Sequence, residues 1–317
     1  MDIKSIIIKL KPNLKTISIN NYVRYINILH RKDAESPNTP IENLDFLLDV
    51  DQINKRFTRL TPKKTYKNNE TTDATIRSYL APVILLLNEY YPKSEALIKF
   101  NELNQKLKNK YQEKVEKFEK SENETKNWMS LKELNEIREN LENKVADYGK
   151  LRILTNMESR DIDYYLIASL YLLNAPVRLN YYNMKVYRNK EIKELPNNEN
   201  YLLINKGVKK QIILNDYKTG KNYSTQIIPV NAKLNRALNL YLKFNKGNIF
   251  PVSQNVFSKM VSRTFTHEDG RSVKINLLRH IYITEHTKVD VKQLKKNKEL
   301  AQKMGHSSAT QLTYNRV

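Results

Sequence analysis

Two stretches near the end of the chain, NLLRHIYITEH (residues 276–286) and KMGHSSATQLTYNRV (residues 303–317), carry the strongest signal in the sequence. The first places Arg279 within an apolar helical repeat, and the second places His306 ahead of Tyr314. Arginine offers a planar fork of donors to phosphate oxygens, histidine a donor near neutral pH, and a phenol an oxygen nucleophile that can form a covalent ester. The combination predicts a tyrosine that attacks a phosphate group of DNA.

The composition favours a polyanionic partner. The chain has 317 residues, enough for two domains, and its 55 Lys and Arg against 34 Asp and Glu leave a formal net charge of +21. Such an excess attracts nucleic acid, because contacts to phosphates release condensed counterions. A bias toward Lys, Asn and Ile from an AT-rich genome is the alternative explanation of this charge.

Several classes of protein are excluded by what the chain lacks. The absence of cysteine excludes disulfides, thiolate metal sites and a cysteine nucleophile. The longest largely apolar runs, 81–87 and 164–173, fall well below the ~20 residues that span a bilayer. The apolar core of residues 6–8 is too short for a signal peptide. We therefore expect an intracellular protein with no membrane partner.

The residue pattern predicts a mainly α fold with a small antiparallel β-sheet (α+β), since the chain is rich in Leu, Lys and Glu and has only 6 glycines. Residues 1–98 are expected to form a helical domain. Residues 99–126, almost all charged or amide with apolar residues three or four apart, predict a charged helical linker or a polar surface helix. Ser130 followed by Glu133 is a capping-box pattern, which places the start of a second domain, 127–317, there.

Within the second domain the periodicity changes twice. Segments rich in Ile, Leu and Tyr and separated by Asn, Gly and Lys predict the strands of the sheet: 201–205, 211–217 and 224–230. Apolar residues at helical spacing predict the helices: 162–174, 231–244, 253–265, 276–287 and 291–304. Arg178 follows the first of these helices, and Lys218 lies in DYKTG (residues 216–220), where two predicted strands turn.

Over residues 127–317 the chain resembles the catalytic domain of the tyrosine recombinases, the phage-integrase family. The residues that carry the resemblance occur in the family's order: Arg178, Lys218, Arg279, His306 and Tyr314. A weaker resemblance, to the family's helical core-DNA-binding domain, covers about 15–98. The resemblance implies a site-specific recombinase or integrase that cleaves and rejoins double-stranded DNA through a 3′-phosphotyrosine intermediate.

The resemblance also implies a role for each residue. Arg178 and Arg279 bracket the charge that develops on the non-bridging phosphate oxygens. Lys218 gives a proton to the departing 5′ oxygen, and His306 donates to a phosphate oxygen. Tyr314 then holds the 3′ end of the DNA as an ester. Because this ester retains the energy of the phosphodiester bond, no metal, ATP or other cofactor is required.

Four features depart from the family's pattern. His306 and Tyr314 are eight residues apart, one fewer than expected. Asn276 stands three residues before Arg279, where the family usually has a histidine, and an amide cannot accept a proton as a base. Tyr181 stands where an acidic residue often follows the first arginine, so the support of that arginine must differ. The loop after Lys218 is lengthened, which makes Lys221 an alternative general acid.

The partners and the competing functions follow from the same resemblance. Recombination requires four protomers around two duplexes, which implies a homotetramer on DNA. The Lys, Asn and Ile richness is similar to that of recombinases of large DNA viruses, virophages and mobile elements, so the implied location is wherever the DNA is, a host nucleus or a viral factory. A type IB topoisomerase that nicks and reseals one strand is an alternative, and Asn276 motivates a second, a DNA-binding relative without catalysis.

Overall fold

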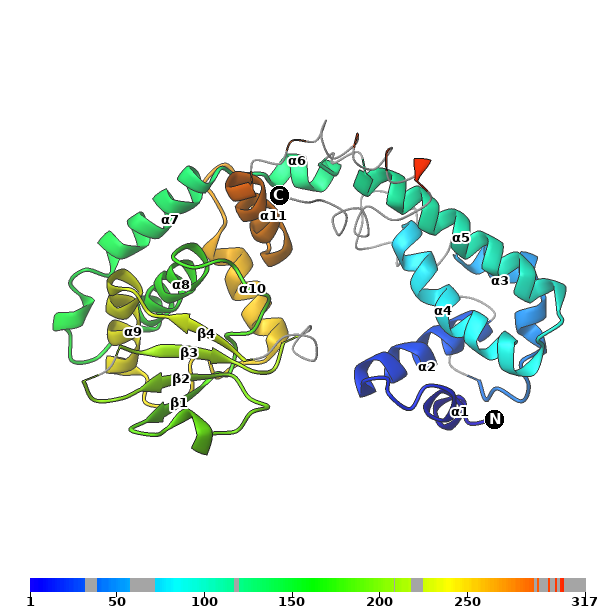
Figure 1. Cartoon of the computed structure of the whole chain (residues 1–317), viewed down its shortest axis with the longest axis horizontal. Helices are drawn as coiled ribbons and strands as arrows, with labels where there is room; N and C mark the ends of the chain where they lie inside the picture. Colours follow the sequence, from blue (N-terminus) through cyan, green and yellow to red (C-terminus); the bar gives the residue numbers. More distant parts are fainter. Residues whose placement is uncertain are drawn as a thin grey trace. The chain divides into compact units, whose positions relative to one another are not determined.

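The computed structural model shows two compact units, which we describe separately (Figure 1). Unit 1 comprises Met1–Glu119 and unit 2 comprises Lys120–Val317. The structure describes the following residues: 1–31, 39–57, 72–116, 120–207, 209–217, 225–287, 290, 296, 300, 303 and 304. Within this part of the chain, no helix is both long enough and apolar enough to cross a bilayer.

Unit 1 is built from helices in its described part. They are α1 (Ile3–Leu10), α2 (Thr16–His30), the short 3-10 helix η1 (Asp45–Leu48), α3 (Val50–Phe57), α4 (Asp73–Tyr90) and α5 (Glu95–Glu116). Helix α4 begins after Thr72, whose side chain accepts a hydrogen bond from the N–H of Thr75. This N-cap satisfies one of the free donors of the first turn and marks where the helix starts.

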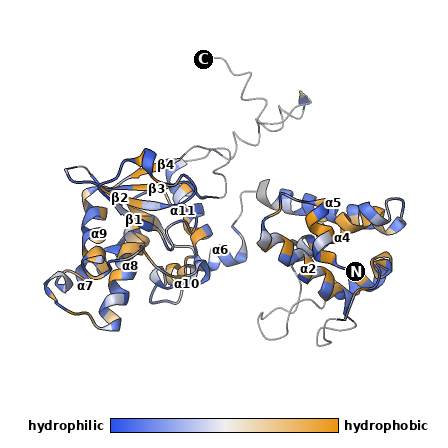
Figure 2. Cartoon of the chain, turned by 90° about the horizontal axis from the view of Figure 1, so that it is seen from below, coloured by the Kyte–Doolittle hydropathy of each residue, from blue (hydrophilic) through white to orange (hydrophobic). Residues whose placement is uncertain are grey.

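Helix α5 belongs to the core of unit 1. Phe100 is fully buried and Leu107 nearly so, and both join the same apolar cluster as Leu87 of α4. Figure 2 shows hydrophobic residues where α2, α4 and α5 meet. The first part of the pattern that predicted a linker from residue 99 therefore packs into the core, whereas Tyr111 is 58% exposed. Unit 1 extends to Glu119 instead of ending at residue 98.

Unit 2 combines helices with a small sheet. Its described elements are α6 (Glu122–Asn127), α7 (Leu131–Lys144), η2 (Tyr148–Lys150), α8 (Asn156–Leu172), β1 (Lys185–Arg188), η3 (Ile192–Glu194), β2 (Tyr201–Ile204), β3 (Gln211–Leu214), β4 (Gln226–Pro229), α9 (Ala232–Phe244), α10 (Gln254–Thr264) and α11 (Ile275–Thr287). The prediction of a mainly helical chain with a small sheet is confirmed for the described residues.

The sheet is mixed, with the strand order β1-β2-β3-β4. The three predicted strands pair antiparallel, β2 with β3 and β3 with β4. Strand β1 pairs parallel with β2, so that Lys185 lies opposite Tyr201, and the prediction of a purely antiparallel sheet is wrong at this pair. The four residues of β1 contain only two apolar side chains, which is too short an alternation to predict a strand.

Helix α8 lies in the core of unit 2. It begins with a capping box between Thr155 and Glu158, and α7, α9 and α10 all pack against it. Its residues Leu166 and Leu170 are fully buried. Alternate residues of β2 and β3 face opposite sides of the sheet. The side that joins the core of α8 includes Leu202 and Ile212, and the other side carries a smaller cluster with Leu203 and Ile213.

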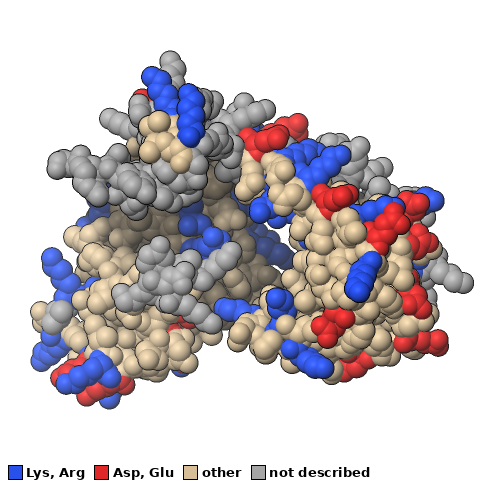
Figure 3. All heavy atoms as spheres, turned by 45° about the vertical axis from the view of Figure 1, so that its right-hand side comes forward, with Lys and Arg blue, Asp and Glu red and all other residues tan. Residues whose placement is uncertain are grey.

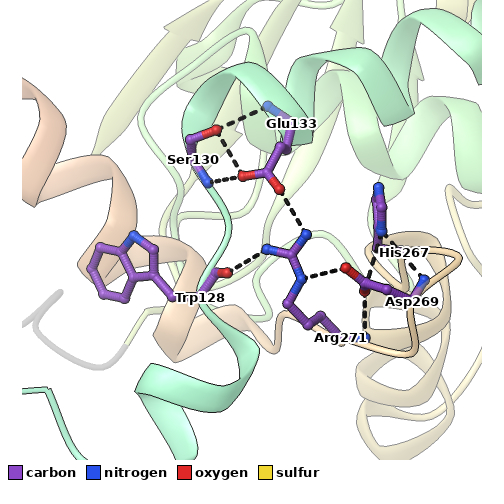
Figure 4. Close-up of polar contacts among 6 residues, drawn as sticks. All are labelled: Trp128, Ser130, Glu133, His267, Asp269 and Arg271. Carbon is purple, nitrogen blue, oxygen red and sulfur yellow. Dashed lines mark hydrogen bonds and ion pairs between the residues drawn. The ribbon is translucent and has the colours of Figure 1, made fainter.

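An arginine joins the start of α7 to the turn that precedes α11 (Figure 4). Arg271 donates hydrogen bonds to the carbonyl of Trp128 at 2.8 Å, to Oε1 of Glu133 at 2.7 Å and to Oδ2 of Asp269 at 2.7 Å. Glu133 also closes the predicted capping box with Ser130, which is thereby confirmed. One guanidinium group therefore connects the entry of a long helix to a turn far along the chain.

Both carboxyl groups of this cluster are unusually acidic. The backbone N–H of Ser130, and after it the side chain of Arg271, lower the pKa of Glu133 to about 2. The backbone N–H of Arg271, together with its side chain, lowers the pKa of Asp269 to about 2. A carboxyl group with a lower pKa in the folded state stabilises the fold above its unfolded pKa. That contribution is lost as the pH falls toward the folded pKa.

We predict that Arg271→Ala lowers the midpoint of thermal unfolding at pH 7. The difference from the parent should shrink as the pH falls from about 4.5 toward 2, because Glu133 and Asp269 become protonated in both proteins. Thermal unfolding followed by circular dichroism at stepped pH measures this. Lys150→Ala is the control, since Lys150 and Asp147 form an ion pair whose side chains are 82% and 81% exposed, and its midpoint should match the parent throughout. A deficit in Arg271→Ala that does not change with pH would contradict the prediction.

Candidate active site

Arg178 lies on the turn that follows α8. Its backbone carbonyl accepts a hydrogen bond of 2.9 Å from Oη of Tyr171, which is fully buried in the last turn of α8. Burial raises the pKa of Tyr171, so the phenol stays protonated and donates. The Tyr171 ring packs edge-on against the ring of Tyr181, with centroids 5.2 Å apart. A buried phenol thus anchors the backbone of Arg178 while its side chain is exposed.

Arg279 lies on α11 between apolar residues that fix the rotation of the helix. Leu278 and Ile281 are fully buried, which leaves Arg279 half-buried at the edge of the core. Burial, and then the positive charge of Arg178, lower the pKa of Arg279. The charge of Arg178 therefore acts on the guanidinium group of Arg279. Both predicted arginines belong to unit 2, one on the turn after α8 and the other on α11.

Neither of these two guanidinium groups has an acidic partner among the described residues. In the described part of unit 2, the arginines that do form ion pairs are Arg138, Arg236 and Arg271. Figure 3 shows acidic side chains frequent on the visible face of unit 1 and sparse on that of unit 2. Two cations that repel each other and have no acidic partner favour a bound anion, because the anion relieves their repulsion.

The turn that carries Arg178 is hydrogen-bonded to the segment that leads out of β3. Nδ2 of Asn180 donates to the carbonyl of Asp216 at 3.0 Å. Asn200, directly before β2, donates to the carbonyls of Asn180 at 3.2 Å and Asp216 at 2.9 Å. Lys218 follows Asp216 by two positions in the sequence. The segments that lead to the first predicted arginine and to the predicted general acid are therefore tied together.

The other predicted site residues lie outside the described residues: Lys218, its alternative Lys221, His306 and Tyr314. The predicted helix over 291–304 also falls mostly outside them. Of the predicted set, the structure thus describes Arg178 and Arg279, and the charge of the first acts on the second.

Other polar residues near Arg279 have different surroundings. Nδ1 of His280 pairs with Oε1 of Glu124 on α6 at 2.6 Å, which ties α11 to α6. Nδ1 of His286 lies 2.8 Å from the carbonyl one helical turn earlier. Asn276, which stands where the family usually has a histidine, is exposed in the first turn of α11. His280 therefore connects α11 to α6, and His286 contacts the backbone of its own helix.

Sequence reasoning missed three residues of the site: Tyr171, Asn180 and Asn200. Tyr171 is one of 20 tyrosines, and its contact with Arg178 depends on how α8 is rotated in the core. Its place seven residues before Arg178, at the end of an apolar helix, is the signal that points to it. The two asparagines carry no signal in an asparagine-rich chain, since their partners are backbone groups of distant segments.

The described part of the site can hold an anion through many donors. Each guanidinium group carries several N–H donors in a planar fork, so two of them together can contact both non-bridging oxygens of one phosphodiester. In comparisons with known proteins, the chain matches no protein-family model, no curated protein and no solved structure.

We predict that Tyr171→Phe lowers the free energy of unfolding by about 1 kcal/mol, because it removes the hydrogen bond to the carbonyl of Arg178. Tyr181→Phe is the matched control. The hydroxyl of Tyr181 is buried and has no partner among the described residues, so its removal should leave stability unchanged or raise it. Urea unfolding followed by the fluorescence of Trp128, the single tryptophan, measures both. An equal loss in the two variants would refute the anchoring role of Tyr171.

Proposed function

We propose that the chain is a site-specific DNA recombinase or integrase that cleaves and rejoins double-stranded DNA through a 3′-phosphotyrosine intermediate. The observation that carries the proposal is that Arg178, on the turn after α8, and Arg279, on α11, repel each other and have no acidic partner among the described residues. Arg279 was expected from its motif and Arg178 from its place after an apolar helix, in order with the later motifs, and the two lie far apart in the chain. The repulsion between these two cations supports a site that binds the phosphate to be cut.

The two arginines suit the charge changes of the reaction. In the cleavage step an oxygen of Tyr314 attacks the phosphorus and forms a P–O bond while the bond to the 5′ oxygen breaks. Negative charge grows on the non-bridging oxygens of the transition state. Arg178 and Arg279 stabilise this charge most when it is largest, and that difference lowers the barrier.

Proton transfer is the task of residues near the leaving oxygen. Lys218, or Lys221 in its place, gives a proton to the 5′ oxygen as it departs, and His306 donates to a phosphate oxygen. A 5′ hydroxyl of a second strand then attacks the phosphotyrosine and rejoins the DNA. Every bond broken is replaced by a bond of similar energy, so the scheme includes no cofactor.

Double-stranded DNA is the proposed substrate, and the excess of 55 Lys and Arg over 34 Asp and Glu supports it. Unit 1 is the proposed core-DNA-binding domain and unit 2 the catalytic domain. Phosphate contacts would supply much of the affinity, which should fall steeply with salt. The proposed active assembly is a homotetramer on two duplexes, located wherever that DNA is, with a mobile element or a large DNA virus as the proposed source.

Two alternatives use the same site. A type IB topoisomerase nicks and reseals one strand as a monomer, and it would relax supercoils without resolving Holliday junctions. A DNA-binding relative without catalysis is favoured by Asn276, because its amide cannot accept a proton from the attacking tyrosine. Junction resolution and the stoichiometry of the DNA-bound protein separate the first alternative from a recombinase.

We predict that the protein becomes covalently attached to DNA and that Tyr314→Phe abolishes the attachment. A library of nicked duplexes with randomised sequence is incubated with the protein, the protein is denatured, and the attached DNA is sequenced. A defined site that is lost in the variant supports the recombinase, whereas attachment without sequence preference supports the topoisomerase. Attachment no greater than in the variant would overturn an enzymatic function.

Removal of either arginine should slow cleavage more than it weakens binding. We predict that Arg178→Ala and Arg279→Ala each lower the single-turnover cleavage rate by about 100-fold to 1000-fold, since each removes donors to the transition state. Arg236→Ala is the matched control, because Arg236 is an exposed arginine of the same unit that pairs with Glu142. A similar loss in all three variants would indicate a general loss of positive charge instead of a role in catalysis.

A further inference from the structure

The side chain of Asn200 uses its full hydrogen-bonding capacity at the start of β2. Its Oδ1 accepts from the backbone N–H of Asn215 at 2.8 Å and of Asp216 at 2.9 Å. Its Nδ2 donates to the carbonyls of Asn180 at 3.2 Å and Asp216 at 2.9 Å. A primary amide offers two N–H donors and two acceptor positions, so each of them is occupied. A half-buried side chain with all its bonds to backbone groups acts as a fixed connector.

Other amides reinforce the same connection. Nδ2 of Asn180 donates to the carbonyl of Asp216, which therefore receives two amide donors. Nδ2 of Asn215 donates to the carbonyl of Glu199 at 3.0 Å, and its Oδ1 accepts from Oγ1 of Thr225 at 2.7 Å. Thr225 directly precedes β4, so the network holds both ends of the loop that joins β3 to β4.

This network begins where the sheet stops. The pairing of β3 with β4 ends at Leu214 opposite Gln226, and the pairing of β2 with β3 ends at Tyr201 opposite Ile213. Beyond these pairs, amide side chains form hydrogen bonds with the backbone N–H groups of residues 215 and 216 and with the carbonyl of residue 216. The loop therefore leaves the sheet at a place set by Asn200 and by the turn that carries Arg178.

We infer that Asn200 is a positioning residue for proton transfer to the leaving oxygen. The inference rests on the proposed function, in which a lysine of the β3–β4 loop is the general acid. Lys218 and Lys221 both belong to the loop whose ends the network holds, so the inference is the same for either lysine. Asn180 belongs to the turn that carries Arg178, so the network also connects the start of this loop to that turn. In the proposed function, Arg178 binds the phosphate.

Sulfur in place of the leaving oxygen isolates this step. During cleavage the tyrosine oxygen bonds to phosphorus and its phenolic proton passes to water. The electron pair of the broken bond leaves with the 5′ atom. An oxygen leaving group needs the proton of the lysine ammonium group, whereas a 5′ sulfur leaves as a thiolate, because thiols are far stronger acids than alcohols. A defect in proton donation should therefore disappear with a 5′-bridging phosphorothiolate.

The test compares Asn200→Ala with Asn205→Ala in the full-length protein. Asn205 follows β2 at its opposite end and forms the same kind of bonds with backbone groups. Its Nδ2 donates to the carbonyl of Lys190 at 2.9 Å, and its Oδ1 accepts from the backbone N–H of Lys190 at 3.1 Å. Single-turnover covalent cleavage is measured on the site recovered from the library, with oxygen or sulfur at the 5′ bridging position. Asn200→Ala should cleave the oxygen substrate about tenfold or more slowly and the sulfur substrate at nearly the parent rate. Asn205→Ala should match the parent on both.

Two results would overturn the inference. An equal loss on both substrates would assign Asn200 a general structural role, and an unchanged rate on the oxygen substrate would show that the loop does not depend on it. If Asn200→Ala does not fold, Asn200→Asp replaces it, since a carboxylate keeps the acceptors for the two N–H groups and loses both donors; the same recovery with sulfur is expected. A parent protein that forms no Tyr314-dependent adduct with either substrate would overturn the proposed function itself, which distinguishes that failure from a failure of the role of Asn200.

Discussion

Helix α8 is packed by α7, α9 and α10, and Tyr171 in its last turn is fully buried. This packing fixes the position of the helix, and the hydrogen bond from Tyr171 extends the constraint to the backbone of Arg178. Helix α11 is held in turn by Leu278 and Ile281 against the same core. Because protein cores are close-packed, small displacements are costly. The positions of the two charged arginines therefore depend on the burial of many apolar side chains.

The repulsion between the guanidinium groups of Arg178 and Arg279 imposes an electrostatic cost on this unit. Arginine remains protonated in proteins, so the repulsion cannot be relieved by loss of a proton, and the lowered pKa of Arg279 reflects it together with burial. Solvent reduces the cost at Arg178, whose side chain is exposed. A phosphate between the two groups would turn the repulsion into attraction on both sides. This is the physical reason why the pair is better suited to bind an anion than to stabilise the empty fold.

Polar side chains connect segments of unit 2 where regular structure ends. Arg271 joins the start of α7 to the turn before α11 through three different acceptors. Asn200 does the same at the end of the β2–β3 pairing, with backbone groups as partners. Both side chains have rigid planar groups that donate in fixed directions, which suits them to define a geometry. Helix packing sets the positions of the helices, and these hydrogen bonds fix the segments that connect them.

Much of the local structure was determined by the sequence alone. Apolar periodicity predicted α8 to α11 and three of the strands, and Ser130 with Glu133 predicted the start of α7, because such patterns act between residues that are near each other in the chain. Motif order also selected Arg178 and Arg279 as candidates. Tertiary contacts were needed to show that the charge of Arg178 acts on Arg279, that β1 adds a parallel strand and that α5 belongs to unit 1. They were also needed to show that Tyr171 and Asn200 hydrogen-bond backbone groups of distant segments. Each of these depends on contacts between segments far apart in sequence, and no local pattern records which distant backbone group a buried phenol or an amide will meet.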